Sequence, residues 1–348
     1  MPSPTTPSNP PQQNVDLDVR GAIPPGLSGR LVGIGRDGVF HSVQVDGGRV
    51  SYRGRRFRTD AVVHNLVAFG SSILAFGEDS PAYELSPDIS MLRRVDLAGY
   101  GRVLAAYPKH DPATGELHLI ARDMDGVQAH VVVSAGALTR RTRPVLDTPS
   151  RIKGLALSRD HAVFVADGFV GVAPRDGEAR TTWVVTGVAA PYPVHAHDAA
   201  DTVVLLAVTP SLERWILHPN TGTIEREVLD STSRRFAHLS VDGVDGPPRW
   251  VWTTGGETIG RDDLVESRRV QQSVGPHVPG DFVVVPDPAR DVDGDGAWFV
   301  GFVHDTSGPT DLYVIDAAEI ARPAISSVRI PRPIPRGLRC AWIPSTQQ

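Results

Sequence analysis

The chain has 348 residues, of which 41% are apolar, and its 35 basic and 40 acidic residues give a net charge of −5. Because these charges are interspersed, the chain offers no basic face for nucleic acid and no polybasic membrane anchor, so we expect neither partner. No run approaches the roughly 20 apolar residues that span a bilayer. The single cysteine, Cys340, excludes an internal disulfide framework, and the sequence therefore predicts a cytoplasmic protein in a reducing compartment.

The first fourteen residues are rich in Pro, Ser, Gln and Asn. They lack the charged and apolar regions of a secretion signal. We predict a disordered tail over residues 1–14 and a single folded domain over residues 15–348.

Short runs that favour β-structure recur along the folded part. They cover residues 30–34, 42–45, 72–76, 117–121, 162–166, 202–207, 250–253, 282–285, 297–303 and 311–315. Turn-forming segments such as Asp46-Gly47-Gly48 and Asn220-Thr221-Gly222 separate them. Many short strands with tight turns and no alternating helices predict an all-β fold, which is a sandwich, a barrel or a propeller. Periodicity alone does not choose among these three.

Several motifs along the chain occur in the order typical of one known family. They lie at residues 21–29, 37–43, 73–78, 108–117, 280–286 and 331–342. In this order they resemble the carotenoid cleavage oxygenase family. The resemblance implies a seven-bladed β-propeller whose axis holds one iron through four histidines, and long polyene or isoprenoid substrates.

The resemblance also locates the four iron-ligand positions, and three of them have changed. They fall on Tyr107, Lys153, His195 and Arg339, so one histidine of four remains. A guanidinium has no acceptor and keeps its positive charge, so Arg339 cannot be a metal ligand. We therefore predict that the chain uses no metal and no other cofactor.

The family's supporting glutamates, which orient the ligand imidazoles, are altered as well. Glu78 is retained, whereas Arg235 and Asp281 replace two others. His238 lies three residues beyond Arg235, and Asp198 belongs to the motif that contains the retained ligand histidine. We predict that these five residues bind ligand around the altered centre.

Two alternatives concern the altered centre itself. In the first, an inactive oxygenase has filled its axial channel with residues that merely pack. Burying the two cations Lys153 and Arg339 without partners would be costly, which favours a retained polar pocket. In the second, the register around Lys153 is shifted, and His161 or His197 takes its place.

A phenol, an ammonium, a guanidinium and an imidazole would together form an oxyanion-binding centre. Lys153 and Arg339 would stabilise an enolate or carboxylate, a neutral His195 would act as general base, and Tyr107 or Lys153 would donate a proton. We predict a cofactor-independent, non-oxidative isomerase or cyclase in natural-product biosynthesis. Its partner would be a hydrophobic polyene, terpenoid or polyketide with a polar head. The alternatives are a non-catalytic binder of apolar ligands and an iron-dependent oxygenase with atypical ligands.

Overall fold

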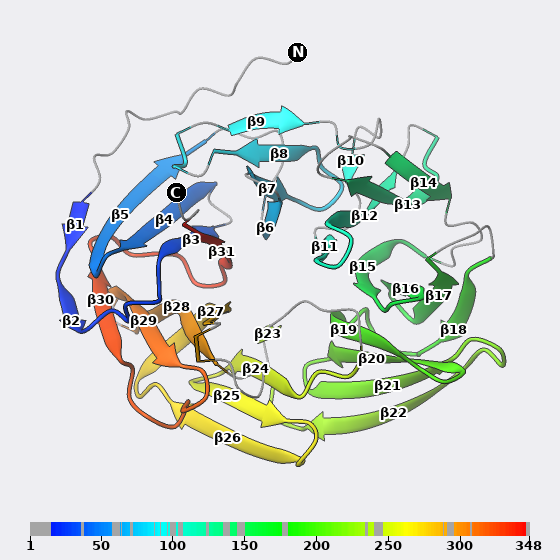
Figure 1. The fold of residues 1–348 in the computed structure, drawn as a ribbon. Coiled ribbons are helices and arrows are strands. Elements are labelled where there is room, and N and C mark those ends of the chain that lie inside the picture. The colour runs from blue at the N-terminus through cyan, green and yellow to red at the C-terminus, as the bar shows by residue number, and fades with distance from the viewer. Residues whose placement is uncertain are drawn as a thin grey trace.

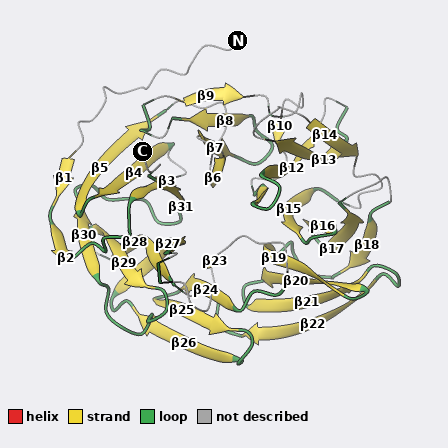
Figure 2. Cartoon of the chain, in the orientation of Figure 1, coloured by secondary structure: helices red, strands yellow, loops and turns green. Residues whose placement is uncertain are grey.

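The computed structural model is a seven-bladed β-propeller (Figure 1). It describes residues 15–35, 38–57, 63, 65–69, 72–86, 88–90, 92–95, 97, 102–103, 107–122, 125–134, 140–144, 150–175, 180–233, 236–239, 246–287, 289–290, 296–306 and 308–345. The predicted tail at residues 1–14 and the predicted site residue Arg235 lie outside this part. Figure 2 shows strands and loops but no helix among the described residues, so none of them forms a helix that could cross a membrane.

Each blade is an antiparallel sheet whose innermost strand faces the propeller axis. From the outermost strand inward, the first blade contains β1 (Val15–Leu17), β5 (Arg49–Arg56), β4 (Val39–Asp46), β3 (Gly29–Ile34) and β31 (Arg339–Pro344). The last blade contains β2 (Val19–Gly21), β30 (Ser326–Ile330), β29 (Thr310–Asp316), β28 (Ala297–Asp305) and β27 (His277–Pro286). The first and last strands of the chain therefore belong to one sheet, which closes the ring.

The other five blades follow the chain in order, here from the innermost strand outward. The second blade contains β6 (Asn65–Phe69), β7 (Ser72–Phe76), β8 (Ala82–Leu85) and β9 (Leu92–Val95), and the third contains β10 (Arg102–Val103) and β11 (Lys109–Asp111), both beside β12 (Glu116–Arg122), then β13 (Gln128–Ser134) and β14 (Arg140–Pro144). The fourth blade contains β15 (Ile152–Leu157), β16 (His161–Ala166), β17 (Phe169–Pro174) and β18 (Thr182–Val185), and the fifth contains β19 (Tyr192–Ala199), β20 (Thr202–Val208), β21 (Leu212–His218) and β22 (Thr223–Asp230). The sixth blade contains β23 (Phe236–His238), β24 (Trp250–Gly255), β25 (Thr258–Asp263) and β26 (Arg268–Ser273). All ten predicted runs lie within these strands, so the all-β prediction is confirmed.

In several blades a middle strand is apolar on both faces because a neighbouring blade covers each face. β20, with the sequence TVVLLAV, is buried along almost its whole length, whereas the outermost strand β22, TIEREVLD, is largely exposed. Leu31 and Val43 of the first blade pack in one cluster with Val300 and Leu312 of the last. Burial of each such side chain contributes about 1.5–3 kcal/mol. The core is therefore divided into wedges between blades, and the axis is left to the innermost strands.

Three innermost strands contain bulges near the axis. The register shifts between Ile152 and Gly154 in β15, between Pro193 and His195 in β19, and between Pro279 and Phe282 in β27. A bulge leaves a residue outside the regular ladder and re-aims the side chains around it. These bulges decide which of the predicted site residues reach a common space.

Candidate functional site

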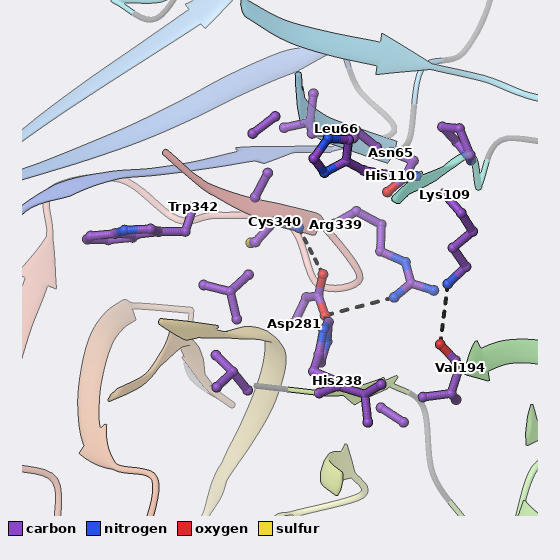
Figure 3. Close-up of a pocket in the computed structure, with 18 of the residues that line it drawn as sticks. Asn65, Leu66, Lys109, His110, Val194, His238, Asp281, Arg339, Cys340 and Trp342 are labelled. Atoms are coloured by element: carbon purple, nitrogen blue, oxygen red, sulfur yellow. Dashed lines mark hydrogen bonds and ion pairs between the residues drawn. The ribbon is translucent and has the colours of Figure 1, made fainter. Parts of the chain in front are cut away.

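A cavity of about 350 Å³ lies at the propeller axis, and we call it the axial cavity. Six innermost strands each contribute a residue to its wall (Figure 3). These residues are Asn65 of β6, Lys109 of β11, Val194 of β19, His238 of β23, Asp281 of β27 and Arg339 of β31. No described residue of β15 lines it. The volume falls within the range of small-molecule sites in proteins.

Asp281 is the most deeply buried charged residue of the cavity, and its carboxylate has three donors around it. Oδ1 accepts a hydrogen bond from His238 Nε2 at 2.7 Å, and Oδ2 accepts one from the backbone N–H of Cys340 at 2.9 Å. Arg339 Nη1 lies 3.8 Å from Oδ1. The side chain of Asp281 is 1% exposed, so it is a buried anion held by a dipole, an imidazole and a cation.

Gly280 allows the bulge of β27 to present Asp281 in this way. A Cβ atom at Gly280 would lie 3.0 Å from the backbone oxygen of Phe302 and 3.0 Å from Nε2 of His304. Both separations are tighter than ordinary van der Waals contact. The bulged backbone therefore approaches β28 as closely as it does because glycine has no side chain.

The bond to Asp281 fixes the proton on the His238 ring. A carboxylate only accepts, so Nε2 must carry the hydrogen, and a neutral His238 has its lone pair on Nδ1. Within the described part of the chain, Nδ1 makes no hydrogen bond. The His238 side chain is 19% exposed and lines the cavity, so the imidazole is oriented by a buried carboxylate on one side and accessible on the other.

The guanidinium of Arg339 lies among three aromatic rings. Its Cζ is 4.3 Å from the ring centre of Phe236, 4.7 Å from that of Tyr192 and 5.2 Å from that of Tyr107. Burial acts to lower the pKa of Arg339, but the oxygens of Tyr192, Asp281 and Tyr107 raise the pKa above its ordinary value. The cavity therefore contains a permanent cation, stabilised by ring faces and a carboxylate.

Lys109 supplies a second cation to the same cavity. Its Nζ donates to the backbone oxygens of Pro193 at 3.3 Å and Val194 at 3.4 Å, and it lies 5.9 Å from the ring centre of Tyr192. Both oxygens belong to the bulged segment of β19. Among the described residues no carboxylate pairs with Lys109. Sequence reasoning missed this residue because it considered only the family's ligand positions, although Lys109 follows Tyr107 by two residues in the same turn.

The structure brings together four of the nine predicted site residues. Asp281, His238 and Arg339 line the cavity, and Tyr107, which contacts Arg339, packs edge-on against Tyr192 with ring centres 5.3 Å apart. Of the four ligand positions in the family, only Tyr107 and Arg339 are therefore near one another.

Lys153 does not line the cavity, contrary to the expectation that it joins Arg339. Its side chain is 44% exposed, and its Nζ lies 2.5 Å from Oδ2 of Asp167 in the turn between β16 and β17. The bulge after Ile152 places Lys153 outside the regular ladder of β15. The second cation in the cavity beside Arg339 is thus Lys109 and not the predicted Lys153.

His195 also turns away from the cavity. It is 7% exposed, its Nε2–H donates to the backbone oxygen of Gly246 at 3.0 Å, and its ring stacks on that of His197 with centres 5.6 Å apart. The bulge at Val194 changes the alternation of β19 just before His195. His197 lies in this stacked pair, and burial lowers the pKa of its imidazole. The structure therefore places His195 outside the cavity that contains Arg339, and its role as general base stays a prediction.

Asp198 and Glu78, which were expected at the centre, lie elsewhere. The Asp198 carboxylate accepts hydrogen bonds from Ser158 Oγ at 2.8 Å, from the backbone of Asp160 at 2.9 Å and from His161 Nδ1 at 2.6 Å. These bonds tie β19 to the turn before β16. Glu78 is exposed in the turn after β7. Neither residue lines the cavity. The alternative register, in which His161 takes the place of Lys153, adds no residue to the cavity either, because His161 is hydrogen-bonded to Asp198.

The donors present do not fit the family's iron centre. Among the described residues no three His, Cys, Asp or Glu side chains lie close enough together to hold a metal ion. At the four ligand positions, Arg339 is a cation between aromatic rings, Lys153 is paired with Asp167, and the Nε2 of His195 is bonded to a carbonyl. The site is therefore best described by its cations Arg339 and Lys109 and its carboxylate Asp281, and not by a metal.

Comparisons with known proteins identify the family. A family model described as retinal pigment epithelial membrane protein matches residues 61–186 and 178–344. A carotenoid cleavage oxygenase from Mycobacterium tuberculosis is 27% identical over an alignment of 151 residues, and the match covers 39% of this chain and 30% of that protein. An apocarotenoid-15,15'-oxygenase from Synechocystis is 26% identical over an alignment of 142 residues, and the match covers 38% of this chain and 29% of that protein. The matched stretch thus spans under a third of each relative's length.

Solved structures agree with the fold. A variant of the Synechocystis apocarotenoid oxygenase superposes with a TM-score of 0.85 at 17% identity, and the match covers 98% of both chains. A lignostilbene dioxygenase from Pseudomonas brassicacearum superposes with a TM-score of 0.84 at 16% identity over 97% of both chains. At these identities the superpositions show the propeller fold alone. The family model, which matches well over half of the sequence, shows that this chain belongs to the carotenoid oxygenase family.

Proposed function

We propose that this protein is a metal-independent enzyme that moves a proton within a conjugated, hydrophobic substrate, as an isomerase or a cyclase. One observation supports the proposal above the others. His238, oriented by the buried carboxylate of Asp281, lies in the wall of the axial cavity together with the permanent cation Arg339. A base and an oxyanion-stabilising cation at one cavity are the two groups that proton abstraction next to a carbonyl requires.

The substrate class follows from the family and from the charges of the cavity. The relatives are named as a carotenoid cleavage oxygenase and an apocarotenoid oxygenase, and carotenoids are conjugated hydrophobic molecules. The two cations favour a molecule with an oxygen-bearing end, which is a carbonyl or a carboxylate. We therefore expect a polyene or a related terpenoid or polyketide whose polar end lies against Arg339.

The chemistry balances without an oxidant. Nδ1 of His238 takes a proton from a carbon conjugated to the substrate's carbonyl group, and the bonding electron pair moves towards the carbonyl oxygen. Arg339 stabilises the negative charge that develops there, while Asp281 stabilises the imidazolium. Return of the proton to a different carbon shifts the double bonds and gives an isomer. Attack of the same electron-rich intermediate on another, electron-poor carbon of the chain moves the negative charge to a new position, and return of the proton from His238 to that position gives a ring of unchanged mass.

The test is to incubate the protein under nitrogen, with a chelator, with polyene acids and aldehydes of graded length. We expect at least one product whose exact mass equals that of its substrate. His238→Gln and Arg339→Gln should each lower turnover by about a hundredfold or more, which is the usual effect of removing such a group. His161→Gln is the matched control because this histidine also pairs with an aspartate but lies outside the cavity. Products of cleavage in a parallel incubation in air without chelator, or binding without any conversion, would contradict the proposal, and the second result would indicate a carrier of apolar ligands.

A further inference from the structure

We infer that the axial cavity selects ligands that end in a carboxylate over neutral ligands with the same carbon skeleton. The inference rests on the proposed function for the location of the site and narrows the choice between a carbonyl and a carboxylate. It concerns binding alone, so it can be tested without turnover. The inference depends on the presence of two cations, Lys109 and Arg339, in the wall of the same cavity.

The charges of the cavity wall do not cancel among the described residues. Lys109 and Arg339 are cations, and Asp281 is the one described carboxylate that lines the cavity. That carboxylate is already occupied by hydrogen bonds from His238 and from the backbone of Cys340. An unmatched cation in a partly buried site costs free energy unless an anion joins it. The wall therefore lacks one negative charge, and a ligand carboxylate would supply it.

Lys109 is the cation that remains uncompensated. Its partners are two backbone oxygens at 3.3 and 3.4 Å, beyond the usual 2.7–3.2 Å range for N–H···O bonds. Carbonyl dipoles orient an ammonium but carry no net charge. The third donor of the ammonium has no acceptor among the described residues. The ammonium is thus held in place by β19 and still has room for a stronger acceptor.

Arg339 also retains donors for a ligand. Its ion pair with Asp281 spans 3.8 Å, which is longer than a hydrogen bond; it also makes a hydrogen bond to the side chain of Tyr107, and its remaining contacts are to ring faces. A guanidinium has five N–H donors in a planar fork that fits a carboxylate in a bidentate fashion. The ring faces stabilise its charge without using those donors. One of the five donors is used by Tyr107, and Arg339 therefore retains donors that can anchor a carboxylate.

Tyr192 links the two cations. Its ring centre lies 4.7 Å from Cζ of Arg339 and 5.9 Å from Nζ of Lys109. Figure 3 shows both charged groups pointing into the space between β11 and β31, on the side away from Trp342. A carboxylate between them would accept from the guanidinium with one oxygen and from the ammonium with the other. The hydrophobic remainder of the ligand would then leave this polar end of the cavity.

Charge-assisted hydrogen bonds are about twice as strong as neutral ones, and tenfold in affinity corresponds to about 1.4 kcal/mol. A methyl ester retains the carbon skeleton and the carbonyl of an acid but lacks the charge. We therefore expect a polyene acid to bind at least about tenfold more tightly than its methyl ester. Lys109→Met, which keeps the length of the side chain, should remove most of that difference.

The chain offers an unusually clean control because Lys109 and Lys153 are its only lysines. Lys153 is paired with Asp167 at the surface, so Lys153→Met should leave the affinities for acid and ester unchanged. Affinities can be measured by the quenching of tryptophan fluorescence, since Trp342 lines the cavity, with all-trans-retinoic acid and its methyl ester as probes. Dimethylation of the lysines with a ¹³C label gives two side-chain NMR signals. The acid should shift the Lys109 signal alone.

Equal affinities for acid and ester, or an acid affinity unchanged by Lys109→Met, would overturn the inference. A shift of the Lys153 signal in place of the Lys109 signal would do the same. These outcomes are separable from failure of the proposed function. Tight, charge-dependent binding without an isomerised product leaves the carboxylate site standing and removes the enzyme. Turnover of neutral carbonyl compounds without a preference for acids would leave the proposed enzyme standing and remove the carboxylate site.

Discussion

Asp281→Asn is the perturbation that reaches most parts of the axial cavity. The carboxylate has two acceptor oxygens, and three donors surround it, from His238, Cys340 and Arg339. An asparagine amide offers one acceptor oxygen and an NH₂ group that can only donate. At least one of the buried donors must then face another donor. The variant also leaves Arg339 without its counter-charge.

The cost follows from these two losses. A buried donor without a partner costs about 1–3 kcal/mol, and removing one member of a buried ion pair costs up to about 3–5 kcal/mol. Because the pair at 3.8 Å is not hydrogen-bonded and Arg339 keeps its aromatic neighbours, we take about 3 kcal/mol as the sum. At about 2.1 cal/mol/K per residue, 348 residues give an unfolding entropy of about 0.7 kcal/mol/K. The melting temperature should therefore fall by about 4 °C.

The effect on activity should be larger than the effect on stability. Without the carboxylate, the imidazole of His238 loses both its fixed tautomer and the charge that stabilises its protonated form. We expect turnover to fall by about a hundredfold or more, within the range for general acid–base catalysis. Thermal unfolding and steady-state turnover of the same preparations provide the two numbers.

Asp198→Asn is the matched control for this experiment. Its carboxylate also accepts three hydrogen bonds, one of them from a histidine, but none of its partners lines the cavity. We expect it to lower the melting temperature by a similar amount and to leave turnover of the folded protein unchanged. If Asp281→Asn reduces turnover no more than Asp198→Asn does, the assignment of a His238–Asp281 pair to the chemistry is wrong.

Two further substitutions test the structure around the site. Asp111 is 1% exposed and pairs with Arg175; burial acts to raise its pKa, but the hydrogen bond and charge of Arg175 outweigh burial and lower the pKa below its ordinary value. The ion pair therefore stabilises the fold fully above about pH 4, and this stabilisation is lost as the pH falls below that value. Asp111→Asn should lower the free energy of unfolding by about 3 kcal/mol near neutral pH and by less in acid. A loss of the same size at both pH values, measured by urea unfolding, would contradict this prediction. Gly280→Ala should destabilise the protein by about 1–3 kcal/mol because its Cβ would press on the backbone of Phe302. It should also weaken binding of polyene acids by shifting Asp281, and unchanged affinity would indicate that β28 moves instead.

The fold was within reach of the sequence for two separate reasons. Apolar runs such as residues 202–207, bounded by turn signals, indicate short strands and are found as β20. They do not distinguish a propeller from a sandwich, because a strand buried on both faces has the same pattern in each. The number of blades came only from the order of the family-like motifs between residues 21 and 342.

The site was predictable only in part because bulges do not appear in a sequence. Arg339 and Asp281 follow from the motifs, and both line the cavity. Lys153 and His195 also stand at family ligand positions, yet each lies at a register shift in its strand and turns to a partner outside the cavity. A displacement of one residue sends a side chain to the other face of a strand. No pattern of residue types in the sequence indicates where such a displacement occurs.

Oxygen uptake during turnover tests metal-independent proton transfer at the His238–Asp281 pair most directly. The protein is mixed in air-saturated buffer with a polyene substrate that it converts, while an oxygen electrode and product analysis follow the same reaction. We expect product to accumulate with no oxygen consumed, at the same rate in air and under nitrogen. Consumption of one oxygen molecule for each product formed would contradict it.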